Sequence, residues 1–129
     1  MIDYNIQTAR KFLFLIFSIL ISCSSNSGRK EIDYNSEFEN GKIALAKKKY
    51  IKAQDYFNTV VIGASHTELG DDALFYLGES FFYSKDYLIA ISEYDRLIRR
   101  MPFSPFIEKA RYRICEAYLI LSPKYFNDQ

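Results

Sequence analysis

The sequence predicts an all-α protein, an α-solenoid in which antiparallel helix pairs are stacked in series behind an N-terminal leader. Two observations predict the stack. Residues recur at an offset of 37 positions, so that Tyr50 maps onto Tyr87, and the apolar residues within each recurring unit have helical spacing. A third observation, an apolar run that starts at Phe12 and stops before Cys23, separates the leader from the repeats.

The leader covers residues 1–22. Arg10 and Lys11 precede the apolar run Phe12–Ile21, which is shorter than the roughly 20 residues that a membrane-spanning helix needs. A positive flank, a short apolar centre and small residues are the layout of a secretory signal peptide. The run ends in the tetrapeptide LISC, which resembles the lipobox of bacterial lipoproteins. We therefore expect a lipoprotein signal peptide, with lipid attachment at Cys23. The alternatives are an ordinary signal peptide with a chance Cys, and a buried N-terminal helix.

Residues 23–32 are expected to form a lipidated, flexible tether. The stretch Ser24–Lys30 is polar and rich in Ser, which is the composition of a flexible linker. Residues 33–129 are then long enough for one small domain.

Composition excludes several function classes. The chain carries 17 Lys and Arg and 16 Asp and Glu. The leader holds two of these basic residues and one of the acidic ones, so the remainder is neutral and no nucleic-acid partner is expected. If Cys23 carries lipid, Cys115 has no disulfide partner, and His66 is the only His. We therefore expect no metal site, no cofactor and no enzymatic activity.

The first two repeat units, at about 33–66 and 70–102, are each predicted to be a helix pair. In the second unit, Asp71 and Asp72 are expected to start the first helix, because carboxylates favour the positive end of the helix dipole. Ser84-Lys85-Asp86 is the predicted turn. Pro102 ends the second helix, because Pro cannot continue a helix.

The third unit, at about 104–122, is a half repeat with one helix. Ser104 is expected to cap it, with Pro105 at its first position, where the missing N–H is not needed. Cys115 falls at the position of Gly41 and Gly78 in the earlier units, which predicts a small buried residue and not a nucleophile.

The repeat has residues of a known family. Gly78, Tyr87, Ala90 and Pro102 stand where the tetratricopeptide repeat has its small residue, aromatic, Ala and Pro, and the pattern resembles that repeat. The resemblance implies a solenoid whose first helices line an inner face.

Matched positions of those first helices are predicted to form a peptide-binding groove. Aromatic rings would supply contact area, and charged side chains would set the register of the bound segment. The predicted groove residues are Phe38, Lys42, Phe75, Glu79, Phe82, Tyr112 and Glu116. Packing between helices is the alternative role for Phe38 and Phe75.

The C-terminal half carries the most specific resemblance. The segment PFSP at 102–105, followed by EKA at 108–110, is similar to the BamD family of outer-membrane assembly lipoproteins. The resemblance implies an outer-membrane location, with a lipid anchor and the protein facing the periplasm. It also implies three kinds of partner, namely BamA, other Bam-complex subunits and unfolded outer-membrane proteins. Relative to that family, the chain is expected to be C-terminally truncated.

Two alternatives stay open from sequence. One is another tetratricopeptide-repeat lipoprotein of the cell envelope, serving Tol or cell-wall coordination. The other is the helper region of a truncated cell-wall enzyme.

Overall fold

The computed structural model describes residues 31–122. Within this range the chain forms the helices α2 (Tyr34–Ala46), α3 (Tyr50–Gly63), α4 (Glu68–Tyr83), α5 (Tyr87–Arg100) and α6 (Ile107–Leu121), and it contains no strand. The predicted signal peptide, the predicted lipid attachment site at Cys23 and most of the predicted tether lie outside the described residues. No helix in the described part has the length and apolar character needed to cross a membrane.

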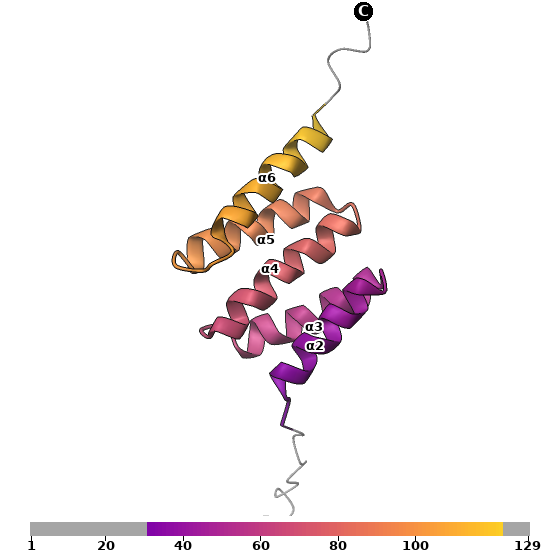
Figure 1. Ribbon diagram of the computed structural model, residues 1–129, viewed down its shortest axis with the longest axis vertical. Coiled ribbons are helices and arrows are strands. Elements are labelled where there is room, and N and C mark those ends of the chain that lie inside the picture. Colours follow the sequence, from indigo (N-terminus) through magenta and orange to yellow (C-terminus); the bar gives the residue numbers. More distant parts are fainter. Residues whose placement is uncertain (1–30, 123–129) are drawn as a thin grey trace, which may run out of the picture. The chain divides into compact units, whose positions relative to one another are not determined.

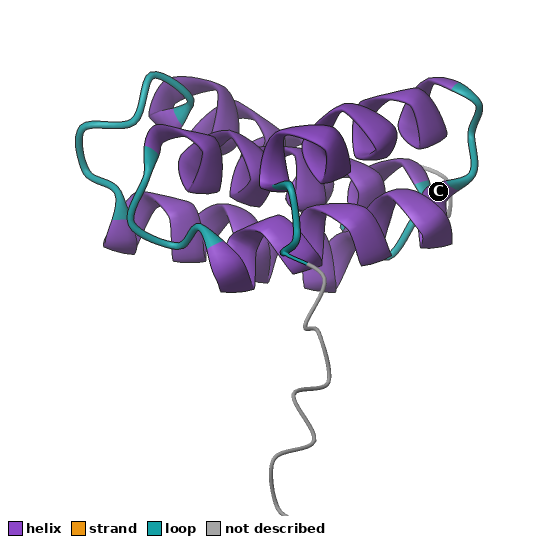
Figure 2. Cartoon of the chain, turned by 90° about the horizontal axis from the view of Figure 1, so that it is seen from below, coloured by secondary structure: helices purple, strands orange, loops and turns teal. Residues whose placement is uncertain are grey.

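The helices pack in series. Each contacts the next along the chain, and α2 also contacts α4. Figure 1 shows this succession, from α2 and α3 at one end to α6 at the other, and Figure 2 shows that only loops join the helices. The all-helical, serial arrangement is the one that the repeat pattern predicts.

The structure repeats helix bounds and turn conformation at the same offset of 37 residues. Shifting α3 by 37 positions reproduces the bounds of α5, and Lys48 and Lys85 share a left-handed backbone conformation, with φ of 57° and 72°. In both turns, the N–H groups of this lysine and the next residue donate to carbonyls three and five positions back. This double hydrogen bond is the Schellman ending of a helix. The two units therefore share their turn geometry as well as their helix bounds.

The core is built from large rings that face small residues. Phe57 and Tyr94, on α3 and α5, have no exposed surface. A Cβ placed on Gly41 would lie 2.6 Å from Cε1 of Phe57, and one on Gly78 would lie 2.6 Å from Cε1 of Tyr94. These glycines let the two helices of a pair approach closely, because any side chain there would occupy the space of the ring.

Two predicted helix starts are wrong. Helix α4 begins at Glu68, before Asp71, because Thr67 caps it by accepting a hydrogen bond from the Gly70 N–H at 3.2 Å. Helix α6 begins at Ile107, after Pro105. Ser104 instead accepts a hydrogen bond from the Phe106 N–H at 3.3 Å, so it stabilises the turn that precedes the helix.

The predicted burial of Cys115 is also wrong, since this side chain is exposed. Gly41 and Gly78 are buried because α3 and α5 cover them. Among residues 31–122, no helix follows α6 to cover Cys115 in the same way.

Candidate peptide-binding groove

Two Phe–Tyr pairs on α4 define the candidate site. Phe75-Tyr76 and Phe82-Tyr83 lie two helical turns apart, and in each pair the Phe is buried while the Tyr is partly exposed. Neighbouring residues on a helix point about 100° apart. A Tyr also prefers a position where its hydroxyl reaches water. The two tyrosines therefore share one outward-facing side of α4.

These tyrosines line a surface depression that we call the Lys–Tyr groove. It comprises two adjoining pockets of about 360 and 590 Å³, which share Lys48, Tyr50 and Tyr83. The full lining also includes Lys42, Leu45, Ala46, Lys49, Ile51, Lys52, Tyr76, Ser84 and Lys85. The residues come from α2, from α4 with the turn that follows it, and from the α2–α3 turn with the start of α3.

Aromatic stacking shapes the groove. The rings of Tyr50 and Tyr83 lie nearly parallel, with centroids 6.4 Å apart. Tyr76 makes edge contacts with Phe38 and Phe75 and stacks on Phe57, with centroids 5.6 Å away in each case. Each of these tyrosine rings thus contacts another aromatic ring, and together they give the groove an aromatic surface.

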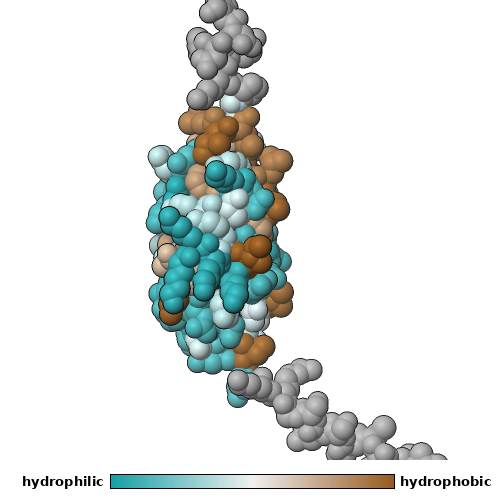
Figure 3. Space-filling model, turned by 90° about the vertical axis from the view of Figure 1, so that its right-hand side faces the viewer, coloured by the Kyte–Doolittle hydropathy of each residue, from teal (hydrophilic) through white to brown (hydrophobic). Residues whose placement is uncertain are grey.

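The groove is cationic. Lys42 pairs with Glu39 at 2.7 Å, and this hydrogen bond raises the pKa of the lysine. Lys48, Lys49, Lys52 and Lys85 have no acidic side chain within salt-bridge distance among residues 31–122. Figure 3 looks onto the side of the stack where the α2–α3 and α4–α5 turns lie, and this side is largely hydrophilic with scattered apolar patches. Such a surface suits a ligand that combines carboxylates with apolar side chains.

The predicted groove residues have different places in the structure. Lys42 lines the Lys–Tyr groove. Phe38, Phe75 and Phe82 are buried at 7%, 0% and 7% exposure, so their rings contact other helices. The contacts of Phe38 and Phe75 are those expected of the alternative role, in which these rings pack between helices. The groove role of the buried rings stays a prediction and would require neighbouring side chains to move.

Of the other three predicted residues, Glu79 and Glu116 belong to a polar cluster between α4 and α6, whereas Tyr112 takes part in none of the hydrogen bonds of that cluster. Glu79 is buried, Glu116 is partly buried, and Tyr112 is 66% exposed on α6. Arg113 donates to Glu79 through Nε at 2.7 Å and Nη2 at 2.9 Å, and to Glu116 at 2.8 Å. The Tyr94 hydroxyl also donates to Glu79, at 2.6 Å.

The contacts of this cluster indicate a structural role, the joining of α6 to α4. Arg113 lies 4.8 Å from the Phe82 ring centroid and donates to the Tyr83 hydroxyl at 3.0 Å. Its contacts with the two carboxylates raise its pKa, and burial next to Glu79 raises the pKa of Tyr94. A charged, bidentate pair of this kind joins α6 to α4 and holds the edge of the groove at Tyr83.

Sequence reasoning missed Tyr50, Tyr76 and Tyr83. It selected Phe38 and Phe75, and each lies one residue before the outward-facing side of its own helix. The available signal was the choice of Tyr next to Phe in both pairs on α4, since a tyrosine hydroxyl needs a hydrogen-bond partner and water supplies one at the surface.

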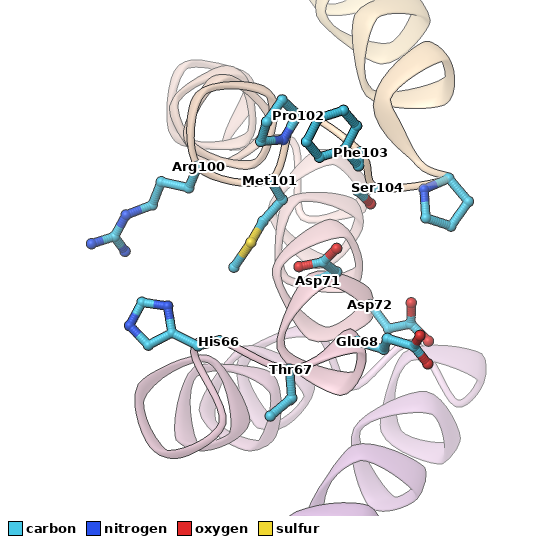
Figure 4. Close-up of a pocket in the computed structure, with 11 residues that line it drawn as sticks. His66, Thr67, Glu68, Asp71, Asp72, Arg100, Met101, Pro102, Phe103 and Ser104 are labelled. Atoms are coloured by element: carbon cyan, nitrogen blue, oxygen red, sulfur yellow. The ribbon is translucent and has the colours of Figure 1, made fainter.

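A separate pocket, of about 670 Å³, lies away from this groove, between the α3–α4 and α5–α6 loops and the first turns of α4 (Figure 4). His66, Thr67 and Glu68 border one side of it, Arg100 to Pro105 border the other, and Asp71 and Asp72 project from α4. Desolvation raises the pKa of both aspartates. In the part of the chain that the structure describes, no three His, Cys, Asp or Glu side chains are placed to hold a metal ion.

Comparison of the chain with models of known protein families gives no match, and a search among curated proteins gives none either.

Proposed function

We propose that this protein is a scaffold of the tetratricopeptide-repeat type that binds extended polypeptide segments in the Lys–Tyr groove. The observation that carries the proposal is the combination in one depression of stacked tyrosine rings and lysines without acidic partners among residues 31–122. Rings bind apolar side chains with little loss of conformational entropy, and lysines attract carboxylates. The expected ligand is an unfolded segment in which aromatic and acidic residues alternate.

The cellular setting of this proposal is the assembly of outer-membrane proteins. The resemblance of PFSP and EKA to the BamD family supports it, together with the lipobox that ends at Cys23. In this setting the chain is anchored by lipid to the outer membrane, faces the periplasm, contacts BamA and other Bam-complex subunits, and receives unfolded outer-membrane proteins. It acts by binding and carries out no reaction.

A peptide-binding measurement tests the groove. The probe is a fluorescent peptide of alternating Phe and Asp, and anisotropy reports its affinity. We expect Tyr50→Ala with Lys49→Ala to weaken binding at least tenfold, because both stacking area and charge are lost. The control is Leu88→Ala, an exposed apolar residue on α5 outside the groove. Equal affinity of the groove variant and the control would contradict the proposal.

A further inference from the structure

The turns that follow α2 and α4 present the same three kinds of side chain. At the offset of 37 residues, the matched pairs are Lys48 and Lys85, Tyr50 and Tyr87, and Ile51 and Leu88. The aliphatic side chains of Ile51 and Leu88 are 74% and 70% exposed. Each unit thus places a lysine, a tyrosine and an exposed aliphatic side chain where its second helix begins.

The two turns lie side by side on one edge of the stack. The ring of Tyr50 stacks on that of Tyr83. Gln54 Nε2 donates to Ser84 Oγ at 3.3 Å, and one pocket of the Lys–Tyr groove is lined by residues of both turns. Figure 1 shows the two turns on the same side of the molecule. We call this surface the lysine edge, and it comprises Lys47, Lys48, Lys49, Ile51, Lys52, Lys85 and Leu88.

The lysine edge is strongly cationic. Its lysines have no acidic side chain within salt-bridge distance among residues 31–122. Asp86 is the one acidic residue in the segments 47–52 and 84–88, and its Oδ2 accepts a hydrogen bond from the Ser84 hydroxyl at 2.6 Å. Each lysine that lies close to an anionic membrane strengthens the binding by about fivefold. The charge of this edge is therefore complementary to an anionic lipid surface.

The exposed aliphatic side chains favour a bilayer over a soluble anion. Ile51 and Leu88 occupy the second positions of α3 and α5, next to the lysines of the same turns. A soluble anion needs only the lysines, whereas aliphatic and tyrosine side chains gain free energy by entering the boundary between headgroups and acyl chains. We infer that the lysine edge docks on the surface of a bilayer that contains anionic lipids. The contact is reversible and distinct from the predicted lipid anchor at Cys23.

This inference goes beyond the proposed function. Lys47 and Leu88 belong to the lysine edge and do not line the Lys–Tyr groove. Lys42 and Tyr76 line the groove and do not belong to the edge. Because the two surfaces share only the residues of the turns and the start of α3, variants outside the shared part separate bilayer docking from peptide binding.

The experiment places a tryptophan on opposite edges of the stack in the full chain, which contains no Trp. Leu88→Trp reports the lysine edge. Ile62→Trp, near the other end of α3, is the matched control, because the wild-type side chain is also 70% exposed. The variants are reconstituted in vesicles of phosphatidylcholine and phosphatidylglycerol with brominated acyl chains, which quench tryptophan fluorescence on contact.

We expect the fluorescence of Leu88→Trp to fall at least twofold in these vesicles and that of Ile62→Trp to change little. In vesicles of phosphatidylcholine alone, or at high salt, the quenching of Leu88→Trp should be weaker, because the attraction is electrostatic. Unchanged circular dichroism establishes that both variants are folded. Equal quenching of the two variants, or equal quenching in neutral and anionic vesicles, would overturn the inference.

A charge variant separates docking from the groove. Lys47→Gln, combined with Leu88→Trp, should weaken bilayer contact about fivefold and leave the affinity for the fluorescent peptide unchanged. The matched control is Arg100→Gln, which removes the same charge at the other end of α5 and should change neither. Full bilayer contact by Lys47→Gln would overturn the inference. If that variant also lost affinity for the peptide, the lysine edge would be a binding surface for polypeptide instead.

Discussion

Gly78 and Tyr94 face each other across α4 and α5, with 2.6 Å between the position of a Cβ on Gly78 and Cε1 of Tyr94. The same distance separates Gly41 from Phe57, 37 positions earlier in each case. This pairing of a glycine with a ring repeats along the stack, and it determines how closely the helices of a pair approach.

Gly78→Ala is expected to destabilise the fold by about 1–3 kcal/mol, because the ring of Tyr94 has to move within a close-packed core. The gain in helix propensity from Ala, about 1 kcal/mol, opposes this loss but is smaller than the clash. Urea denaturation followed by circular dichroism measures the difference. Ser92→Ala, on the exposed side of α5, is the control, and its free energy of unfolding should change little. A Gly78→Ala protein as stable as this control would contradict the packing.

Arg113→Ala should cost about 3 kcal/mol of stability. The side chain of Glu79 is only 8% exposed, and without Arg113 its charge stays buried with a single hydroxyl donor, that of Tyr94. The matched control is Arg111→Ala on the same helix. Its pair with Glu108 is exposed at 61% and 84%, so its loss should change stability by less than about 0.5 kcal/mol. Similar unfolding midpoints for the two variants would show that the Glu79 pair contributes no more than a surface pair.

Stability should fall at high pH through Tyr94. Burial first, and the neighbouring Glu79 second, raise the pKa of its hydroxyl above the ordinary value of 10.0. The unfolded chain therefore loses this proton at lower pH than the folded chain does, and the stabilisation present below pH 10 is lost as the pH rises.

We expect this decline to reach up to about 1.4 kcal/mol per pH unit from this one group. Urea titrations between pH 8 and 11 measure it. Tyr94→Phe should have a shallower dependence over the same range. Parallel curves for the two proteins would rule out the raised pKa.

Lys85→Gly is expected to stabilise the protein by about 1 kcal/mol. Lys85 has a φ of 72° just after the end of α4. This conformation is energetically unfavourable for an L-amino acid with a side chain, and glycine adopts it freely. Thermal unfolding measures the gain. Asp86→Gly, one residue further at a negative φ of −82°, should give no gain. A lower melting temperature for Lys85→Gly would indicate that the lysine side chain stabilises the turn.

Cys23→Ala tests the anchor, which rests on the resemblance of LISC to a lipobox. We expect the variant to lack lipid and to be recovered in the soluble fraction, because the lipid on Cys23 is the membrane anchor that the sequence predicts. Incorporation of labelled palmitate and membrane fractionation measure these outcomes, with Ser24→Ala as the neighbouring control. Membrane association of Cys23→Ala at the wild-type level would contradict lipid anchoring.

The sequence alone determined the helix pairs and their repeat. Apolar spacing and the offset of 37 positions depend on local periodicity, and the bounds of α3 and α5 obey that offset. Helix starts were less predictable. Thr67 and Asp71 are both able to cap a helix, and which of them does so depends on where the preceding loop leaves the backbone.

Tertiary structure decided which face of each helix is open. A shift of one residue, from Phe75 to Tyr76, turns the side chain by about 100° and moves it from the core to the groove. The pairing of Glu79 with Arg113, 34 residues away, and the exposure of Cys115 likewise depend on which helix packs against which. Local spacing defines a helix, but only its neighbours determine which of its side chains are covered, because burial is a property of contacts between distant segments of the chain.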